Sequence, residues 1–140
     1  MPKPLSSLSC IMIVFLSIFS CQHERAMTQR EVLVQITEKH SIDVQSLHQK
    51  LQNTPTVIDV RTPEEFASGH IPTATNIPLQ DFTTHIKNLE KHKLQEIYLV
   101  CATGVRSQQA TNMLLQQGFT KAINVEGGTR GWKAKGFRTE

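Results

Sequence analysis

The feature of this sequence that most restricts its fold is an alternation of short apolar runs with helix-forming segments. Residues 57–60 and 97–100 are almost continuously apolar, which is typical of strands buried on both faces of a sheet. Helix signals follow each run. Because parallel strands are joined by crossover connections that are usually helical, the alternation predicts an α/β fold, with a parallel sheet flanked by helices on both faces.

The segment after the first run carries several agreeing signals for the start of a helix. Thr62 is the expected N-cap, Pro63 occupies the first helical position, and Glu65 completes a capping box. Gly69 and Pro72 end this helix after a few residues. Similar signals predict helices capped by Asp43 and Asp81, a helix after residue 101 that ends at a left-handed Gly118, and a short helix around Trp132. Two further strands are predicted at residues 74–77 and 122–125.

The composition excludes several classes of function. The 140 residues suffice for one domain. The net charge of +3 is small and no basic cluster is interleaved with aromatic residues, so no nucleic-acid partner is expected. The three cysteines cannot supply metal-binding pairs, and the six histidines lack a zinc-binding spacing, so no metal site is expected.

The first residues of the chain have the pattern of an export signal. Residues 5–19 carry no charge, and this run is shorter than the roughly 20 apolar residues of a membrane-spanning helix. Residues 18–21 resemble a bacterial lipoprotein processing site, in which Cys21 becomes the lipidated N-terminus. Ordinary cleavage near the same point and an uncleaved anchor are the alternatives. Each places the domain outside the cytoplasm, in the periplasm or cell envelope, and a lipid on Cys21 would hold it at a membrane.

These patterns divide the chain into three parts. Residues 1–20 are expected to be a lipoprotein-type signal peptide, residues 21–37 a tether and N-terminal segment, and residues 38–140 the folded domain. With Cys21 acylated and the signal removed, Cys101 would have no partner for a disulfide. A single free thiol in an oxidising compartment indicates a functional cysteine.

Cys101 is the strongest candidate for a catalytic residue. It follows the apolar run 97–100 and precedes a short loop and a helix, an order that directs backbone N–H groups and the positive end of the helix dipole toward the sulfur. A thiol in that position ionises easily, and the thiolate is the nucleophile. Gly104 permits a tight loop, Arg106 offers a fixed positive charge, and Ser107 is the expected N-cap of the helix. The alternative is a small buried core residue.

Several spaced motifs resemble the rhodanese homology domain. They are residues 57–66 with 69–72, residues 101–107, and residues 124–128 with Gly131 and Trp132. The resemblance covers about residues 42–136 and implies a five-stranded parallel sheet flanked by helices, a rhodanese-like fold. Thr73 departs from the family, which usually has glycine there, and we expect a conventional backbone angle at this threonine.

The resemblance implies sulfurtransferase chemistry. The Cys101 thiolate would take the outer sulfur of a donor such as thiosulfate, and the resulting persulfide would pass it to a thiol or to cyanide, with no metal or diffusible cofactor. The substrate-binding residues would be Ala102, Thr103, Gly104, Val105 and Arg106. Arg106 would either fix the loop or hold the donor oxyanion. Structural roles beside the site are expected for Asp59, Arg61 and His70, although His70 is also a candidate general base. Candidates for the rim of the pocket are Glu126 and Arg130, and Trp132 is expected to anchor the core.

Three other functions remain open. A phosphatase is disfavoured because the loop from Cys101 to Arg106 has six residues, whereas phosphatase relatives have one more. An arsenate reductase could use the same thiolate. A sulfur-carrier or binding module with little turnover on small molecules is the main alternative, because the loop side chains Ala102, Thr103 and Val105 are uncharged and would attract free thiosulfate weakly.

Overall fold

The computed structural model describes residues 28–32 and 40–140. The expected signal peptide, Cys21 and most of the expected tether lie outside the described residues. The chain divides into two compact units, Met1–Val34 and Gln35–Glu140. In the first, residues 28–32 form one helical turn in which Thr28 and Glu31 cap each other's backbone N–H groups. Among the described residues, no helix combines the length and apolar character that a membrane crossing requires.

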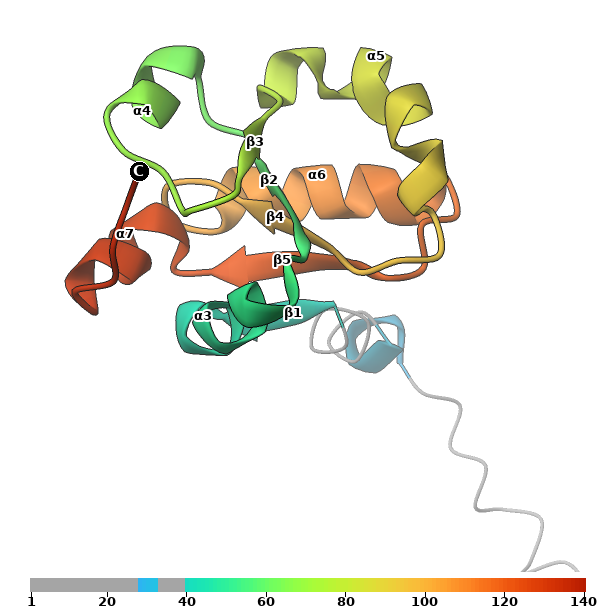
Figure 1. Ribbon diagram of the computed structural model, residues 1–140. Coiled ribbons are helices and arrows are strands. Elements are labelled where there is room, and N and C mark those ends of the chain that lie inside the picture. Colours follow the sequence, from blue (N-terminus) through green and yellow to red (C-terminus); the bar gives the residue numbers. More distant parts are fainter. Residues whose placement is uncertain (1–27, 33–39) are drawn as a thin grey trace, which may run out of the picture. The chain divides into compact units, whose positions relative to one another are not determined.

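The second unit is built on one sheet of five parallel strands, as predicted (Figure 1). The strands lie in the order β1-β5-β4-β2-β3, so that β4 is central and the crossover connections pass over the two faces. Leu99 on β4 pairs with Ile58 on β2 and with Asn124 on β5. The strand bounds are β1 Ser41–Asp43, β2 Thr56–Asp59, β3 Thr75–Asn76, β4 Ile97–Val100 and β5 Ala122–Glu126.

Helices cover both faces of this sheet, which also confirms the prediction (Figure 1). On one face, Ile58 and Leu99 pack with buried side chains of α5, η3 and α6. On the other, Tyr98 and Val100 pack with α3 and α7, where Trp132 is 1% exposed and anchors the core as expected. The helices are α3 Val44–Lys50, α4 Pro63–Ala67, α5 Phe82–His85, α6 Val105–Gln116 and α7 Gly128–Ala134, with 3-10 helices η1 Leu51–Asn53, η2 Leu79–Asp81 and η3 Ile86–His92.

The helix ends agree with the sequence where the signal is local. Thr62 and Glu65 form the predicted capping box of α4. The Asp43 carboxylate accepts the Ser46 N–H at 2.7 Å and caps α3. The helical segment predicted after Asp81 is present as α5 followed directly by η3, and Phe82, Ile86 and Leu89 are buried as expected. Asp81 is the N-cap residue of α5 but makes no capping bond with its side chain, so that part of the prediction is wrong.

Thr73 also differs from the expectation. Its φ is +69°, in the left-handed region that a β-branched residue rarely adopts, so the predicted conventional angle is wrong. The turn between α4 and β3 thus holds a threonine in a conformation that glycine adopts without strain. The threonine is exposed, so its Cβ is strained by its own backbone and not by neighbouring side chains.

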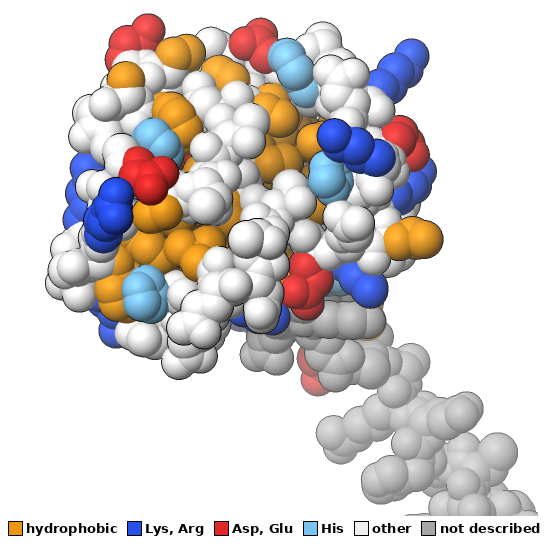
Figure 2. All heavy atoms as spheres, viewed as in Figure 1, with side chains coloured by type: hydrophobic (Ala, Val, Ile, Leu, Met, Phe, Trp, Pro, Cys, Tyr) orange, Lys and Arg blue, Asp and Glu red, His pale blue; other side chains and the backbone are white. Residues whose placement is uncertain are grey.

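Charged side chains do not gather by sign on the visible surface. On the face drawn in Figure 2, lysine and arginine side chains alternate with aspartate and glutamate, and apolar side chains show between them. This mixture agrees with the small net charge of +3 and gives that face no extended basic patch for a polyanion.

Candidate functional site

Cys101 lies at the carboxyl end of the central strand β4, where open α/β sheets bind their ligands. The chain turns sharply after it, and Gly104, with a φ of +107°, is the N-cap of α6. Ser107 therefore lies inside the first turn of α6 and does not cap it, so that prediction is wrong. The physical reason is that the loop enters the helix through a left-handed residue, which glycine adopts without strain.

The carbonyl groups of the loop are held from behind by the start of α7. The backbone N–H of Thr129 donates to the Cys101 carbonyl at 2.8 Å, and that of Arg130 donates to the Ala102 carbonyl at 3.0 Å. The chains approach so closely that a Cβ on Gly128 would overlap the Cys101 carbonyl oxygen and lie 2.7 Å from the Ala102 carbonyl carbon. Gly128, which belongs to the third motif, thus allows α7 to come close enough to hold the loop.

The Cys101 sulfur faces the hydrogen-bond donors of the loop and of α6. The Gly104 N–H donates to Sγ at 3.1 Å, and the Ser107 hydroxyl lies 3.4 Å from it. Burial raises the pKa of the Cys101 thiol, but hydrogen bonds to the sulfur outweigh burial, and the pKa lies below its ordinary value. The donors are the Ser107 hydroxyl and the backbone N–H groups of Ser107, Thr103 and Gly104. These features favour a thiolate, the nucleophilic form of cysteine.

Arg106 is committed to an ion pair. Its two terminal nitrogens bind the two carboxylate oxygens of Glu65, each at 2.7 Å. The Arg106 hydrogen bonds lower the pKa of Glu65 to about 2. Since Glu65 also accepts the Thr62 N–H in the capping box, this fork ties the loop to α4. Its geometry corresponds to the first of the two roles expected for Arg106, that of fixing the loop.

The three residues expected to be structural make contacts of that kind. Asp59 and Arg61 form a buried pair with a 2.7 Å contact between Oδ2 and Nη2, and Arg61 also donates to the Gly69 carbonyl. His70 stacks on Phe66 with ring centroids 3.7 Å apart, and its Nδ1 lies 3.2 Å from the Phe66 carbonyl. These contacts hold the segment after α4 against the end of β2.

The surface of the loop is uncharged and partly apolar. Thr103 is exposed, and Val105 is 68% exposed although it is an aliphatic residue. A cavity of about 280 Å³ adjoins Arg106 and is lined mainly by uncharged residues. Its lining consists of Val60, Thr62, Pro78, Leu79, Gln80 and Arg106. Because Arg106 is paired with Glu65, little net charge is available here to attract a free anion.

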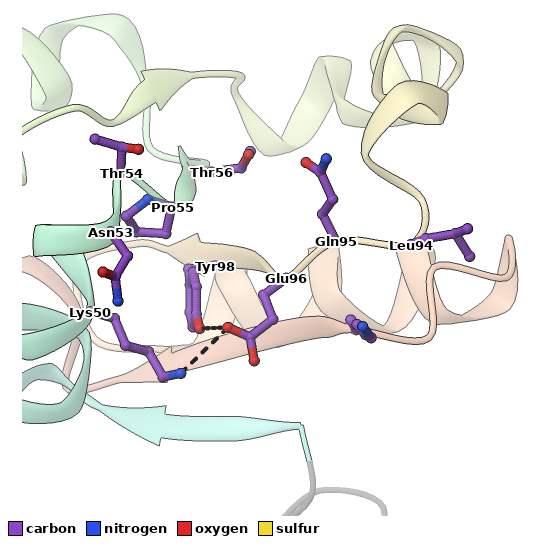
Figure 3. Close-up of a pocket in the computed structure, with 10 residues that line it drawn as sticks. Lys50, Asn53, Thr54, Pro55, Thr56, Leu94, Gln95, Glu96 and Tyr98 are labelled. Atoms are coloured by element: carbon purple, nitrogen blue, oxygen red, sulfur yellow. Dashed lines mark hydrogen bonds and ion pairs between the residues drawn. The ribbon is translucent and has the colours of Figure 1, made fainter.

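A second cavity, of about 430 Å³, lies at the other end of β4 (Figure 3). There Lys50 and the Tyr98 hydroxyl both bind the Glu96 carboxylate, which points into the space between them. The Tyr98 hydroxyl lowers the pKa of Glu96, the largest effect on this group. This cavity is at the amino end of the strands, away from Cys101, and its lining holds no cysteine.

Sequence reasoning missed two residues of the site. Asn124 on β5 lies with its Oδ1 2.6 Å from the Ser107 hydroxyl oxygen, and both residues are buried. Glu65 was recognised only as a capping residue, although it also holds Arg106. Asn124 belongs to the third motif, and a polar side chain in a strand otherwise rich in apolar residues was the available signal.

Comparison with known proteins agrees with this geometry. The rhodanese-like domain family matches residues 43–135. A sulfurtransferase of Allochromatium vinosum is 35% identical over 100 residues, covering 70% of this chain and 92% of that protein. The putative sulfur carrier protein YrkF of Bacillus subtilis is 35% identical over 96 residues, covering 67% of this chain and 51% of that protein. The crystal structure of a rhodanese-related protein from Thermoplasma volcanium is 33% identical with a TM-score of 0.66, covering 72% of this chain and 97% of that one.

The chain therefore belongs to the rhodanese-like domain family, and sulfurtransferases are among its relatives. Its fold and the position of Cys101 after β4 are those that the resemblance of the motifs implies.

Proposed function

We propose that this protein transfers sulfane sulfur through a persulfide on Cys101. The observation that carries the proposal is the set of N–H and O–H donors around a buried sulfur, with the Gly104 N–H at 3.1 Å. Such donors stabilise negative charge on sulfur in the thiolate and in the persulfide alike. The same loop therefore serves both resting states of a two-step transfer.

The first step forms a bond between Sγ of Cys101 and the outer sulfur of a donor. With thiosulfate, the bond between the two sulfur atoms of the donor breaks, and sulfite leaves with the electron pair. In the second step an acceptor thiolate attacks the outer sulfur of the persulfide, and the Cys101 thiolate is the leaving group. No proton is needed in either step when both nucleophiles are ionised, so His70 has no task as a base.

The proposal is tested by intact-mass analysis after incubation with thiosulfate or another sulfane donor. We expect one added sulfur atom on the unaltered chain, and its loss after addition of a thiol. Cys101→Ser should fold normally and gain no sulfur. A chain that gains no sulfur from any sulfane donor, while folded, would overturn the proposal.

A sulfur carrier that exchanges sulfur with a protein partner is the second candidate. It is favoured by the exposure of Val105, which makes the loop surface partly apolar, and by the pairing of Arg106, the cation of the loop, with Glu65. A carrier would accept one sulfur in a single turnover and show slow steady-state turnover with thiosulfate and cyanide. Rapid turnover at micromolar thiosulfate would rule the carrier out in favour of a small-molecule enzyme.

Phosphatase and arsenate reductase activities are the remaining enzyme alternatives. The six-residue loop favours sulfur over a phosphoryl group, and we expect no hydrolysis of an aryl phosphate and no reduction of arsenate. If either activity were found and were abolished in Cys101→Ala, that activity would be preferred to sulfur transfer.

We also propose that the protein is exported and held at a membrane by a lipid on Cys21, with residues 1–20 removed. Support comes from the uncharged run 5–19 and the processing-site pattern at 18–21. Sulfur transfer would then occur in the periplasm or at the cell envelope. The proposed sulfurtransferase chemistry does not depend on this location.

A further inference from the structure

Two buried polar side chains lie next to each other beside the Cys101 sulfur: Ser107, whose hydroxyl is one of the donors to that sulfur, and Asn124. Ser107 is 0% exposed and Asn124 is 4% exposed. The Ser107 hydroxyl oxygen is 2.6 Å from Asn124 Oδ1 and 3.4 Å from Cys101 Sγ. A hydroxyl has one hydrogen, so these two acceptors compete for it.

The protonation state of Cys101 decides this competition. When Cys101 is a thiol, the Asn124 oxygen is the nearer acceptor and receives the Ser107 hydrogen. When Cys101 is a thiolate or carries an ionised persulfide, the sulfur side becomes a charged acceptor, and hydrogen bonds to ions are roughly twice as strong as neutral ones. The hydroxyl then turns toward the sulfur.

That turn leaves two oxygens facing each other without a hydrogen between them. At 2.6 Å, Asn124 Oδ1 and Ser107 Oγ would repel each other. A half-turn of the asparagine amide replaces Oδ1 with Nδ2, which donates to Ser107 Oγ. Within residues 40–140, the one hydrogen bond of the Asn124 side chain is made by Oδ1, so this turn breaks no bond of Nδ2.

The neighbouring strand offers a donor for the displaced oxygen. Ser41 on β1 lies in register with Asn124 on β5, so both side chains point to the same face of the sheet. The Ser41 hydroxyl is the buried side-chain group that lacks a hydrogen-bond partner in the described part of the chain. Buried polar groups without partners are rare, and this one belongs to the residue that is paired with Asn124 on the neighbouring strand.

We propose that Asn124 is a positioning residue whose amide turns over when Cys101 ionises, so that Ser41, Asn124 and Ser107 form one hydrogen-bonded row that ends on the sulfur. The inference rests on the proposed function only in taking ionised sulfur as the reactive form. No covalent bond changes in the row, because the hydrogen of Ser107 stays on its oxygen and only its direction changes.

Charged groups around the loop are already paired or exposed. Arg106 binds Glu65, and Arg61 binds Asp59. Glu126 and Arg130 have exposed side chains, and the titratable residue next to Ser41 is His40, whose Nδ1 lies 3.0 Å from the Ala122 carbonyl oxygen on β5. The row consists of uncharged polar side chains. Through it, a change in the charge of the Cys101 sulfur alters the hydrogen bonds of Ser41 on β1.

The direct test follows the side-chain amide of Asn124 by NMR as pH is varied, with no donor present. Its two N–H signals, assigned by their loss in Asn124→Asp, should shift with the same midpoint as alkylation of Cys101. In Cys101→Ser the transition should disappear. Asn112, whose amide lies on the exposed part of α6, is the matched control and should not follow this midpoint. Asn124 signals that stay constant through the Cys101 midpoint would overturn the proposal.

A double-mutant comparison tests the coupling in a second way. Aspartate at position 124 accepts hydrogen bonds but cannot turn to donate one, so it should hold the Ser107 hydrogen away from the sulfur. We expect Asn124→Asp to slow the alkylation of Cys101 at neutral pH both in the unaltered chain and in Ser107→Ala. The slowing should be about tenfold larger when Ser107 is present, which corresponds to a difference of about one unit in the pKa of Cys101. Equal slowing in both backgrounds would show a charge effect alone and reject the row.

Both tests use unloaded protein. A chain that shows the coupling but gains no sulfur from donors would defeat the proposed function and leave this inference standing. A chain that gains sulfur but lacks the coupling would overturn this inference and leave the proposed function standing.

Discussion

Replacement of Gly128 by alanine should damage the site through backbone contact alone. Gly128 has a φ of +52°, and a Cβ there would overlap the Cys101 carbonyl oxygen. Gly136 supplies the matched control, since its φ is +73° and a Cβ would meet nothing within 4 Å. Both substitutions force alanine into the left-handed region, but only Gly128→Ala must also push α7 away from the loop.

The two variants should differ by the hydrogen bonds that α7 makes. The left-handed conformation costs an L-residue about 1–2 kcal/mol, and alanine recovers about 0.4–1 kcal/mol by restricting the unfolded chain. Gly136→Ala should therefore lower the free energy of unfolding by about 1 kcal/mol. Gly128→Ala should lose in addition the bond from Thr129 to the Cys101 carbonyl, and a buried group left unpaired costs about 1–3 kcal/mol.

Thermal unfolding and alkylation measure the two consequences separately. For a domain of this size about 1 kcal/mol shifts Tm by about 4–8 °C, so Gly128→Ala should melt clearly below Gly136→Ala. Alkylation of Cys101 at neutral pH should slow in Gly128→Ala, because displacement of the loop moves donors away from the sulfur, and should be unchanged in Gly136→Ala. Equal melting temperatures together with unchanged alkylation in both variants would refute the role given to the close approach of Gly128.

Three further predictions concern other parts of the chain. Thr73→Gly should stabilise the domain by about 1 kcal/mol, because glycine relieves the left-handed strain, whereas Thr73→Ala keeps the Cβ and should not stabilise it. Chemical denaturation measures both variants, and a Thr73→Gly variant less stable than the unaltered chain would contradict the argument. The lowered pKa of Glu65, about 2, means that its ion pair with Arg106 contributes stability fully above the ordinary pKa of about 4.5 and loses it as the pH falls toward 2. The difference in stability between the unaltered chain and Glu65→Gln should therefore be constant above pH 5 and shrink in acid, and a difference independent of pH would exclude that pair as its source. Cys21→Ala should move the protein from the membrane fraction to the soluble or unprocessed fraction, and an unchanged distribution would reject the lipid anchor.

The parts of the fold that sequence reasoning predicted depend on local signals. The apolar runs around Ile58 and Leu99 predict buried strands because few other structures bury such runs on both sides. Thr62 and Glu65 cap α4 through bonds between residues three apart, and such bonds require no knowledge of the tertiary structure. The place of Cys101 follows in the same way from the order of strand, loop and helix.

The parts that were missed depend on contacts between distant segments. Glu65 and Arg106 are far apart in the sequence, and only the packing of α4 beside the loop brings them together. Ser107 has the chemistry of an N-cap, but the left-handed Gly104 moved the cap three residues earlier and turned the hydroxyl inward. Thr73 shows the opposite case, in which the geometry of a turn overrides the preference of the residue that occupies it.

The contact between α7 and the loop has a consequence for biosynthesis. The residues that hold the loop carbonyls, Thr129 and Arg130, follow Cys101 in the chain and emerge from the ribosome after it. A nascent or prematurely truncated chain that lacks α7 contains Cys101 but lacks the two hydrogen bonds that hold the carbonyl groups of its loop. We expect the thiol of such a chain to be less reactive, because the bonds that hold the loop carbonyl groups form only after α7 has been synthesised.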